Sequence, residues 1–184
     1  MPPRPIPPAP RMSRRTFLGT LAAAASLPLW GAAAAACPGP GIHTEAIPAT
    51  GERLPAIGMG SWITFNVGKD PELRAQRVEV LRAFFEGGGG MIDSSPMYGS
   101  SEAVIGNCLD RLGHPETTFS ATKVWHMLTG SGKEQMAESR QLWGVKRFDL
   151  MQVHNLLNWE GHLETLQADK VAGRIRYLGV TTSH

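Results

Sequence analysis

The sequence predicts an α/β protein of the (β/α)8 TIM-barrel type, with about the first five strands of the barrel present. Short apolar runs alternate with helical patterns from residue 42 onward, which is the pattern of a parallel sheet with right-handed crossovers. Five strand-like and four helix-like segments follow one another without a long linker. Unusual polar residues fall at the ends of strand-like runs, where barrel active sites are built.

The first half of this pattern begins with a strand-like run at 56–60, after a Thr-Gly turn. Asp70 and Pro71 form an N-cap and first-turn pair that predicts the start of a helix, and four glycines at 87–90 end it. The predicted apolar face of this helix consists of Leu73, Val80, Leu81 and Phe84.

The second half continues the alternation. A second helix begins near Ser101 and stops at Gly113. A weaker helical pattern covers 133–142, and another, carrying Leu166 and Val171, closes at Gly173. The remaining strand-like runs are 91–95, 118–125, 148–155 and 174–182.

A doubly wound sheet is the alternative to the barrel. Its nucleotide-binding fingerprint would follow the first strand, but Gly58 and Gly60 form a lone GxG without the third glycine or the later acidic residue. Barrels run to about 250 residues, whereas 148 follow position 36. We therefore expect residues 37–184 to be the N-terminal portion of a barrel, without strands six to eight and their phosphate-binding region.

The first 36 residues differ in charge from the remainder. They hold 4 of the 18 basic residues and none of the 16 acidic ones, so the remainder carries a net charge of −2. No basic stripe predicts a nucleic-acid partner. Neither cysteine has a histidine or second cysteine at ligand spacing, so no metal site is predicted.

Residues 1–36 resemble a twin-arginine signal peptide. Ser13, Arg14, Arg15 and Phe17 precede a short apolar stretch and an alanine run. We expect recognition by the twin-arginine export machinery, cleavage after Ala36, a periplasmic or otherwise exported product and no stable membrane insertion after cleavage. A lipoprotein anchored at Cys37 is the weaker alternative, because Ala34 stands where a lipobox has a larger aliphatic residue.

Four residues carry the predicted chemistry. Asp93, Lys123 and His154 each end a different strand-like run, and Tyr98 lies on the loop five residues after Asp93. Each alone has a structural explanation, such as a cap or a packed ring. A lysine in an apolar strand, however, needs a charged partner, and all four would converge on one face of a barrel.

These residue types suit the reduction of a carbonyl. Hydride addition leaves negative charge on the carbonyl oxygen, so the site must donate a proton there. A phenol is a poor acid at neutral pH, and an ammonium held by a carboxylate would favour its charged form. We therefore expect Asp93 and Lys123 to lower the pKa of Tyr98, and a neutral His154 to orient the carbonyl.

Residues 50–182 resemble the aldo-keto reductase superfamily in the segments GMGSW, MIDSSPMYG, SATKVW, DLMQVHN and GRIRYLGVT. The resemblance implies a barrel enzyme that uses NADPH, or less often NADH, with Tyr98 as proton donor, tuned by Lys123 and Asp93, and His154 orienting the substrate. It places the cofactor near Gly60, Ser61, Trp62, Asp93, Thr181 and Thr182. It also places Trp62, Trp125 and His154 in the substrate pocket, although core packing of the two tryptophans is the alternative.

One departure concerns the cofactor. Most family members have Ser-Asn where this chain has Thr181 and Thr182, and Thr182 cannot supply an amide to the nicotinamide carboxamide. Two functions therefore remain open: an NAD(P)H-dependent reductase of a small aldehyde or ketone, and a truncated, non-catalytic barrel fragment or cofactor-sensing binding module. Since the periplasm is not expected to hold free NADPH, export of the reductase would require cofactor loading beforehand.

Overall fold

A parallel five-stranded sheet organises the part of the chain that the computed structural model describes, residues 41–183. Its strands are β3 (Met59–Gly60), β4 (Met91–Asp93), β5 (Phe119–Val124), β6 (Phe148–Val153) and β7 (Ile175–Val180). They are hydrogen-bonded in sequence order. A doubly wound sheet reverses its strand order at a switch point; this one does not, and the predicted barrel-type α/β fold is confirmed.

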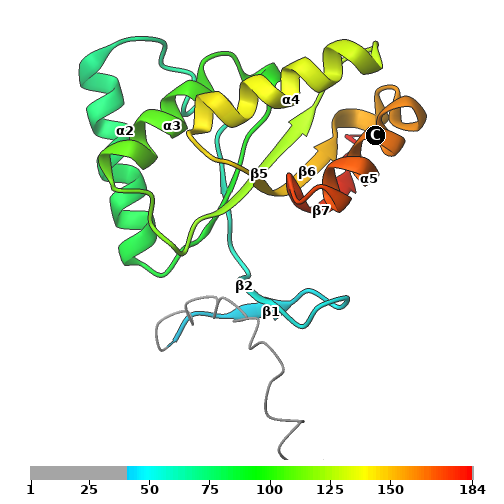
Figure 1. The fold of residues 1–184 in the computed structure, drawn as a ribbon. Helices are drawn as coiled ribbons and strands as arrows, with labels where there is room; N and C mark the ends of the chain where they lie inside the picture. Colours follow the sequence, from blue (N-terminus) through cyan, green and yellow to red (C-terminus); the bar gives the residue numbers. More distant parts are fainter. Residues whose placement is uncertain (1–40, 184) are drawn as a thin grey trace, which may run out of the picture. The chain divides into compact units, whose positions relative to one another are not determined.

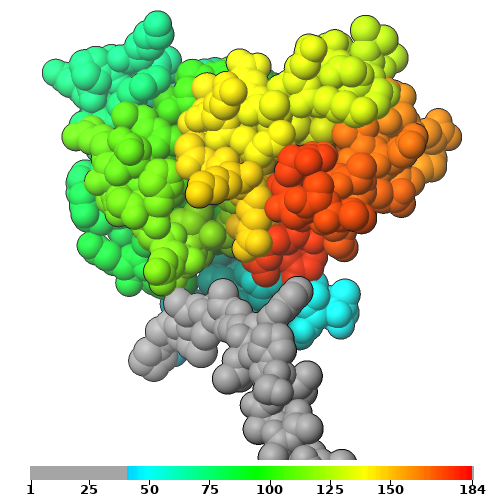
Figure 2. Space-filling view, viewed as in Figure 1, coloured from blue at the N-terminus to red at the C-terminus, as the bar shows by residue number. Residues whose placement is uncertain are grey.

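Four helices connect these strands: α2 (Pro71–Glu86), α3 (Ser101–Arg111), α4 (Thr129–Trp143) and α5 (Trp159–Val171). Figure 1 shows them following the strands in turn, and in Figure 2 side chains of α3, α4 and α5 form a continuous surface. The start of α2 is as predicted, since Asp70 Oδ1 accepts hydrogen bonds from the backbone N–H groups of Glu72 and Leu73.

Two predicted helix faces are partly wrong. Val80 of α2 is 45% exposed, and the buried valine on that helix is Val78. Both valines lie within one helical turn of Leu81, so the spacing of apolar residues does not show which of the two is buried. Val171 at the end of α5 is also exposed, while Leu166 is buried as predicted.

Several element boundaries also differ from the prediction. Strand β3 covers only Met59–Gly60 of the predicted run 56–60. Helix α4 begins at Thr129 rather than near Lys133, although Gly130 and Gly132 are poor helix formers. Tertiary packing overrides that propensity, because Gly132 is buried against the ring of His162. Strand β6 ends at Val153, and His154 begins the short 3-10 helix η3 (His154–Leu156).

An antiparallel hairpin of β1 (Thr44–Ala46) and β2 (Arg53–Pro55) precedes the sheet and was not predicted. The predicted Thr-Gly turn lies between its strands, where Gly51 has a φ of 73°. Glu52 joins the hairpin to the sheet by an ion pair with Arg176 of β7 and a hydrogen bond from the Tyr177 hydroxyl at 2.6 Å.

The core lies between the sheet and the helices. Its largest fully buried apolar side chains are Trp143, Phe65, Phe148, Leu81, Ile92, Ile105, Leu109, Met136, Met151, Leu166 and Ile175. No helix among residues 41–183 is long and apolar enough to cross a membrane. The predicted signal peptide, residues 1–36, and the alternative lipidation site at Cys37 lie outside the described residues.

Candidate active site

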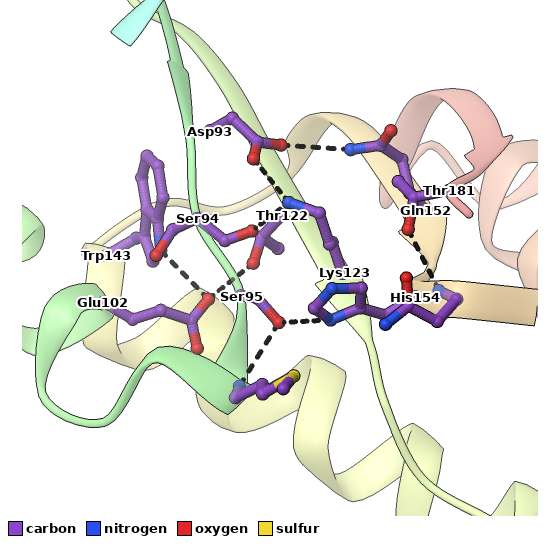
Figure 3. Close-up of polar contacts among 12 residues, drawn as sticks. Asp93, Ser94, Ser95, Glu102, Thr122, Lys123, Trp143, Gln152, His154 and Thr181 are labelled. Carbon is purple, nitrogen blue, oxygen red and sulfur yellow. Dashed lines mark hydrogen bonds and ion pairs between the residues drawn. The ribbon is translucent and has the colours of Figure 1, made fainter. Parts of the chain in front are cut away.

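The carboxyl ends of β4, β5 and β6 bring three of the four predicted residues together (Figure 3). Asp93 is the last residue of β4, as predicted. Lys123 is the penultimate residue of β5, and His154 follows β6 directly. Because parallel strands end at the same edge of a sheet, all three side chains face one site.

Lys123 lies at the centre of this site. Its side chain is buried, with the residue 4% exposed. The ammonium forms an ion pair with Asp93 Oδ2 and donates a hydrogen bond to the carbonyl oxygen of Ser94 at 2.8 Å. The other carboxylate oxygen of Asp93, Oδ1, accepts a hydrogen bond from Gln152 Nε2 at 3.1 Å. The lysine predicted to need a charged partner in an apolar strand therefore has one.

Tyr98 reaches the site from the short 3-10 helix η2 (Pro96–Tyr98) that follows β4. The Ser95 side chain caps this helix by accepting a hydrogen bond from Met97 N–H. The Tyr98 ring centroid lies 5.4 Å from Lys123 Nζ and 5.8 Å from the centroid of the His154 ring, which it meets edge to face. The four predicted residues thus form one cluster.

The predicted effect on Tyr98 is wrong in its sign. Burial raises the pKa of Tyr98 above its ordinary value, and the Asp93 carboxylate raises it further. The Lys123 ammonium does not reverse this, because its charge is paired with Asp93 and lies against the face of the ring. The phenol is therefore protonated at neutral pH, which is the state that a proton donor requires.

The pKa of His154 shifts in the opposite direction to that of Tyr98. Burial lowers the pKa of His154, and the Lys123 charge lowers it further, with Asp93 acting in the other direction. The imidazole is therefore neutral at neutral pH. Ser95 Oγ lies 2.9 Å from His154 Nδ1, so one edge of the ring is held by a hydrogen bond.

The two tryptophans predicted in the pocket are not core residues. Trp62, after β3, is 65% exposed, and Trp125, after β5, is 39% exposed. The Trp62 ring centroid lies 6.3 Å from that of Tyr98. Within residues 41–183 neither ring is packed in the core, and the assignment of both to the pocket stays a prediction.

The residues predicted to hold the cofactor differ in their exposure and in their hydrogen bonds. At Gly60 a side-chain carbon would meet no atom within 4 Å, so the end of β3 is open. Ser61 is fully buried, and among the described residues its Oγ has no hydrogen-bond partner. Thr181 Oγ1 accepts a hydrogen bond from Asn155 N–H at 3.0 Å and retains its own proton to donate. Thr182 follows it and is exposed.

The sequence analysis missed two residues of the site, Gln152 and Ser95. Gln152 stands two positions before His154 in the strand-like run predicted at 148–155, and side chains alternate along a strand, so this spacing could have indicated it. Ser95 carried no such signal, because its contact with His154 depends on how η2 follows β4.

These settings fit a nicotinamide cofactor at the open end of β3. The exposed Trp62 ring, 6.3 Å from that of Tyr98, and the space at Gly60 are compatible with a flat polar ring beside Tyr98, whereas Thr181 lies after β7, at the other edge of the sheet. The site as a whole can place a neutral phenol, a neutral imidazole and a buried ammonium near one bound oxygen.

A sheet of this order, with a polar cluster at the carboxyl ends of its strands, is typical of barrel proteins. The aldo/keto reductase family matches the chain over residues 56–184, and the chain belongs to this family. Methylglyoxal reductase YeaE of Escherichia coli is 34% identical over 136 residues, which cover 70% of this chain and 45% of that protein. The chain thus spans less than half the length of this relative.

Solved structures agree with this assignment. An aldo/keto reductase from Klebsiella pneumoniae, in complex with NADP and acetate, is 25% identical with a TM-score of 0.60; the match covers 71% of this chain and 46% of that one. A thermostable aldo-keto reductase, Tm1743, bound to the inhibitor epalrestat, has a TM-score of 0.66 at 25% identity, covering 76% of this chain and 53% of that one.

Proposed function

We propose that the protein reduces an aldehyde or ketone to an alcohol with NADPH, or less often NADH, and that Tyr98 donates the proton. The observation that carries the proposal is the cluster in which a protonated Tyr98 lies close to both the buried Lys123 ammonium, at 5.4 Å, and the neutral His154, at 5.8 Å. Membership of the aldo/keto reductase family supports it.

Each residue of the cluster would have its own role in the reaction. The bound cofactor supplies a hydride to the carbonyl carbon. Tyr98 transfers its hydroxyl proton to the carbonyl oxygen as charge develops there, which leaves a phenolate. The Lys123 ammonium, held by Asp93 at 5.4 Å from the Tyr98 ring centroid, would offset part of the charge of that phenolate. His154 donates a hydrogen bond that orients the carbonyl.

The cofactor would be held at the ends of β3, β4 and β7. The residues assigned to it are Gly60, Ser61, Trp62, Asp93, Thr181 and Thr182. The solved Klebsiella pneumoniae relative in complex with NADP supports a nicotinamide cofactor of this type. Asp93 would act here chiefly through Lys123, because both of its carboxylate oxygens are already engaged.

The substrate pocket would lie between Trp62, Trp125 and His154. Both tryptophans expose apolar surface after strands that reach the site, which suits a small carbonyl compound with an apolar side. The similarity to methylglyoxal reductase YeaE supports an aldehyde as the first substrate to test.

The test is NADPH oxidation with methylglyoxal and a panel of aldehydes and ketones. It uses the 184-residue chain and a form extended to the length of the matched reductases. Turnover that Tyr98→Phe abolishes supports the proposal. Absence of turnover in both forms would overturn it in favour of the non-catalytic alternative.

We also propose that residues 1–36 direct export by the twin-arginine route to the periplasm, with soluble release preferred over anchoring at Cys37. The Ser13–Leu18 segment and the alanine run before position 37 support this. Replacing Arg14 and Arg15 by lysine should retain the protein in the cytoplasm, as measured by fractionation. Fractionation that does not change would contradict export by this route.

Export also requires that the cofactor be bound before translocation. The twin-arginine route carries folded proteins, which is compatible with such loading. Protein purified from the periplasm should then contain a nicotinamide cofactor, detected by mass spectrometry after denaturation. Periplasmic protein without any would overturn this part of the proposal.

A further inference from the structure

Ser95 lies between the two halves of the candidate active site. It is fully buried, two residues after the end of β4 and directly before the helix η2 that carries Tyr98. Its Oγ accepts a hydrogen bond from Met97 N–H at 3.2 Å and lies 2.9 Å from His154 Nδ1 (Figure 3). One hydroxyl therefore touches both the element that places the phenol and the imidazole itself.

The direction of the second hydrogen bond follows from the first. A serine hydroxyl has one proton to donate and two lone pairs that accept. Met97 N–H uses one lone pair. Within residues 41–183, His154 Nδ1 is the partner that remains for the hydroxyl proton, and a buried donor without an acceptor is costly. The hydroxyl therefore donates to Nδ1.

We infer that Ser95 is a positioning residue that holds His154 in the tautomer protonated at Nε2. With Nδ1 occupied as an acceptor, a neutral imidazole carries its single proton on Nε2. That N–H is the donor that the substrate carbonyl needs. This role rests on the proposed carbonyl reduction, whereas the tautomer itself is a property of the chain alone.

The charges around His154 do not fix the tautomer by themselves. The ionisable groups that act on it are Lys123 and Asp93, which oppose each other, and Tyr98, which contacts the ring edge to face. Neither Lys123 nor Asp93 is hydrogen-bonded to an imidazole nitrogen. The Ser95 hydroxyl is the group in direct contact with Nδ1.

The test combines nitrogen NMR with one substitution. In the wild-type chain, 15N shifts of His154 should show Nδ1 unprotonated and Nε2 protonated; the reverse assignment would overturn the inference. In Ser95→Ala, Nδ1 loses its donor, so the 15N shifts should show a mixture of the two tautomers. An unchanged Nε2–H tautomer in Ser95→Ala would also overturn the inference.

Activity gives the second readout, with Ser120→Ala as a matched control. Ser120 is also a buried serine, and its Oγ makes two hydrogen bonds to Asp149 near the opposite end of β5. Ser95→Ala should lower kcat about tenfold, while Ser120→Ala leaves kcat unchanged. Equal kcat in the Ser95→Ala and wild-type chains would overturn the positioning role.

The two proposals can fail separately. A wild-type chain without turnover in either length would count against the reduction of carbonyls. The NMR assignment of the His154 tautomer in the wild-type and Ser95→Ala chains would still decide the role of Ser95 in setting the tautomer.

Discussion

The buried carboxylate of Glu102 on α3 gives a prediction about stability whose sign depends on pH. Glu102 is 2% exposed, and three neutral groups donate hydrogen bonds to it: Thr122 Oγ1 at 2.7 Å, Ser139 Oγ at 3.0 Å and Trp143 Nε1 at 3.2 Å. Burial raises the pKa of Glu102, and these hydrogen bonds oppose the rise without cancelling it. The ionised form therefore costs stability.

The pH window follows from that direction. The stabilisation contributed by protonated Glu102 is fully present below its unfolded pKa of 4.5. It is lost as pH rises through the higher folded pKa, at up to about 1.4 kcal/mol per pH unit. Glu102→Gln removes the charge and can keep every contact. The amide oxygen accepts from Thr122 and Trp143, which share Oε1, and the amide nitrogen donates to Ser139 Oγ.

Glu102→Gln should therefore raise the free energy of unfolding by about 1–2 kcal/mol at pH 8 and have little effect near pH 4. Urea unfolding followed by far-ultraviolet circular dichroism at several pH values measures this. Glu102→Ala is the control, since it leaves three buried donors unpaired and should cost about 3–5 kcal/mol. A Glu102→Gln protein less stable than the wild type at pH 8, or a gain independent of pH, would refute the reasoning.

Two further predictions concern the hairpin and the helix packing. The Arg176 hydrogen bond lowers the pKa of Glu52, so Glu52→Gln should cost about 1–2 kcal/mol at pH 7. That cost should vanish as pH falls through the folded pKa, and urea unfolding giving an equal loss at pH 7 and pH 3 would contradict it. Gly106→Ala places a carbon 1.7 Å from the Leu142 carbonyl oxygen and should cost about 3 kcal/mol, whereas Gly130→Ala, with nothing within 4 Å, should stabilise α4 slightly. Thermal melts in which Gly106→Ala is no worse than Gly130→Ala would argue against the close approach of α3 and α4.

The sequence predicted the order of strands and helices because each crossover has a local signature. The Asp70 cap of α2 and the start of α3 at Ser101 depend on neighbouring residues, and both are as predicted. The boundary at His154 could not be predicted in this way. Asn155 adopts a positive φ of 52°, and its N–H donates a hydrogen bond to Thr181 Oγ1, directly after the neighbouring strand β7.

The burial of Glu102 could not be predicted from the sequence either. A glutamate in the first turn of a helix is expected to face water, and three donors from β5 and α4 reverse that expectation. The predicted direction of the Tyr98 pKa shift was wrong for a related reason. The sequence indicated a lysine beside the phenol, but whether its charge is paired with Asp93 or with Tyr98 depends on distances between strands.

The central claim is that Tyr98 donates the proton in a carbonyl reduction. Its most direct test is a single-turnover measurement of NADPH oxidation by an aldehyde, with NADPH binding measured by fluorescence on the same samples. It compares Tyr98 and Tyr98→Phe proteins extended to the length of the matched reductases. We predict that NADPH affinity changes little while the rate falls at least about 100-fold. Equal oxidation rates in the two proteins would contradict the account.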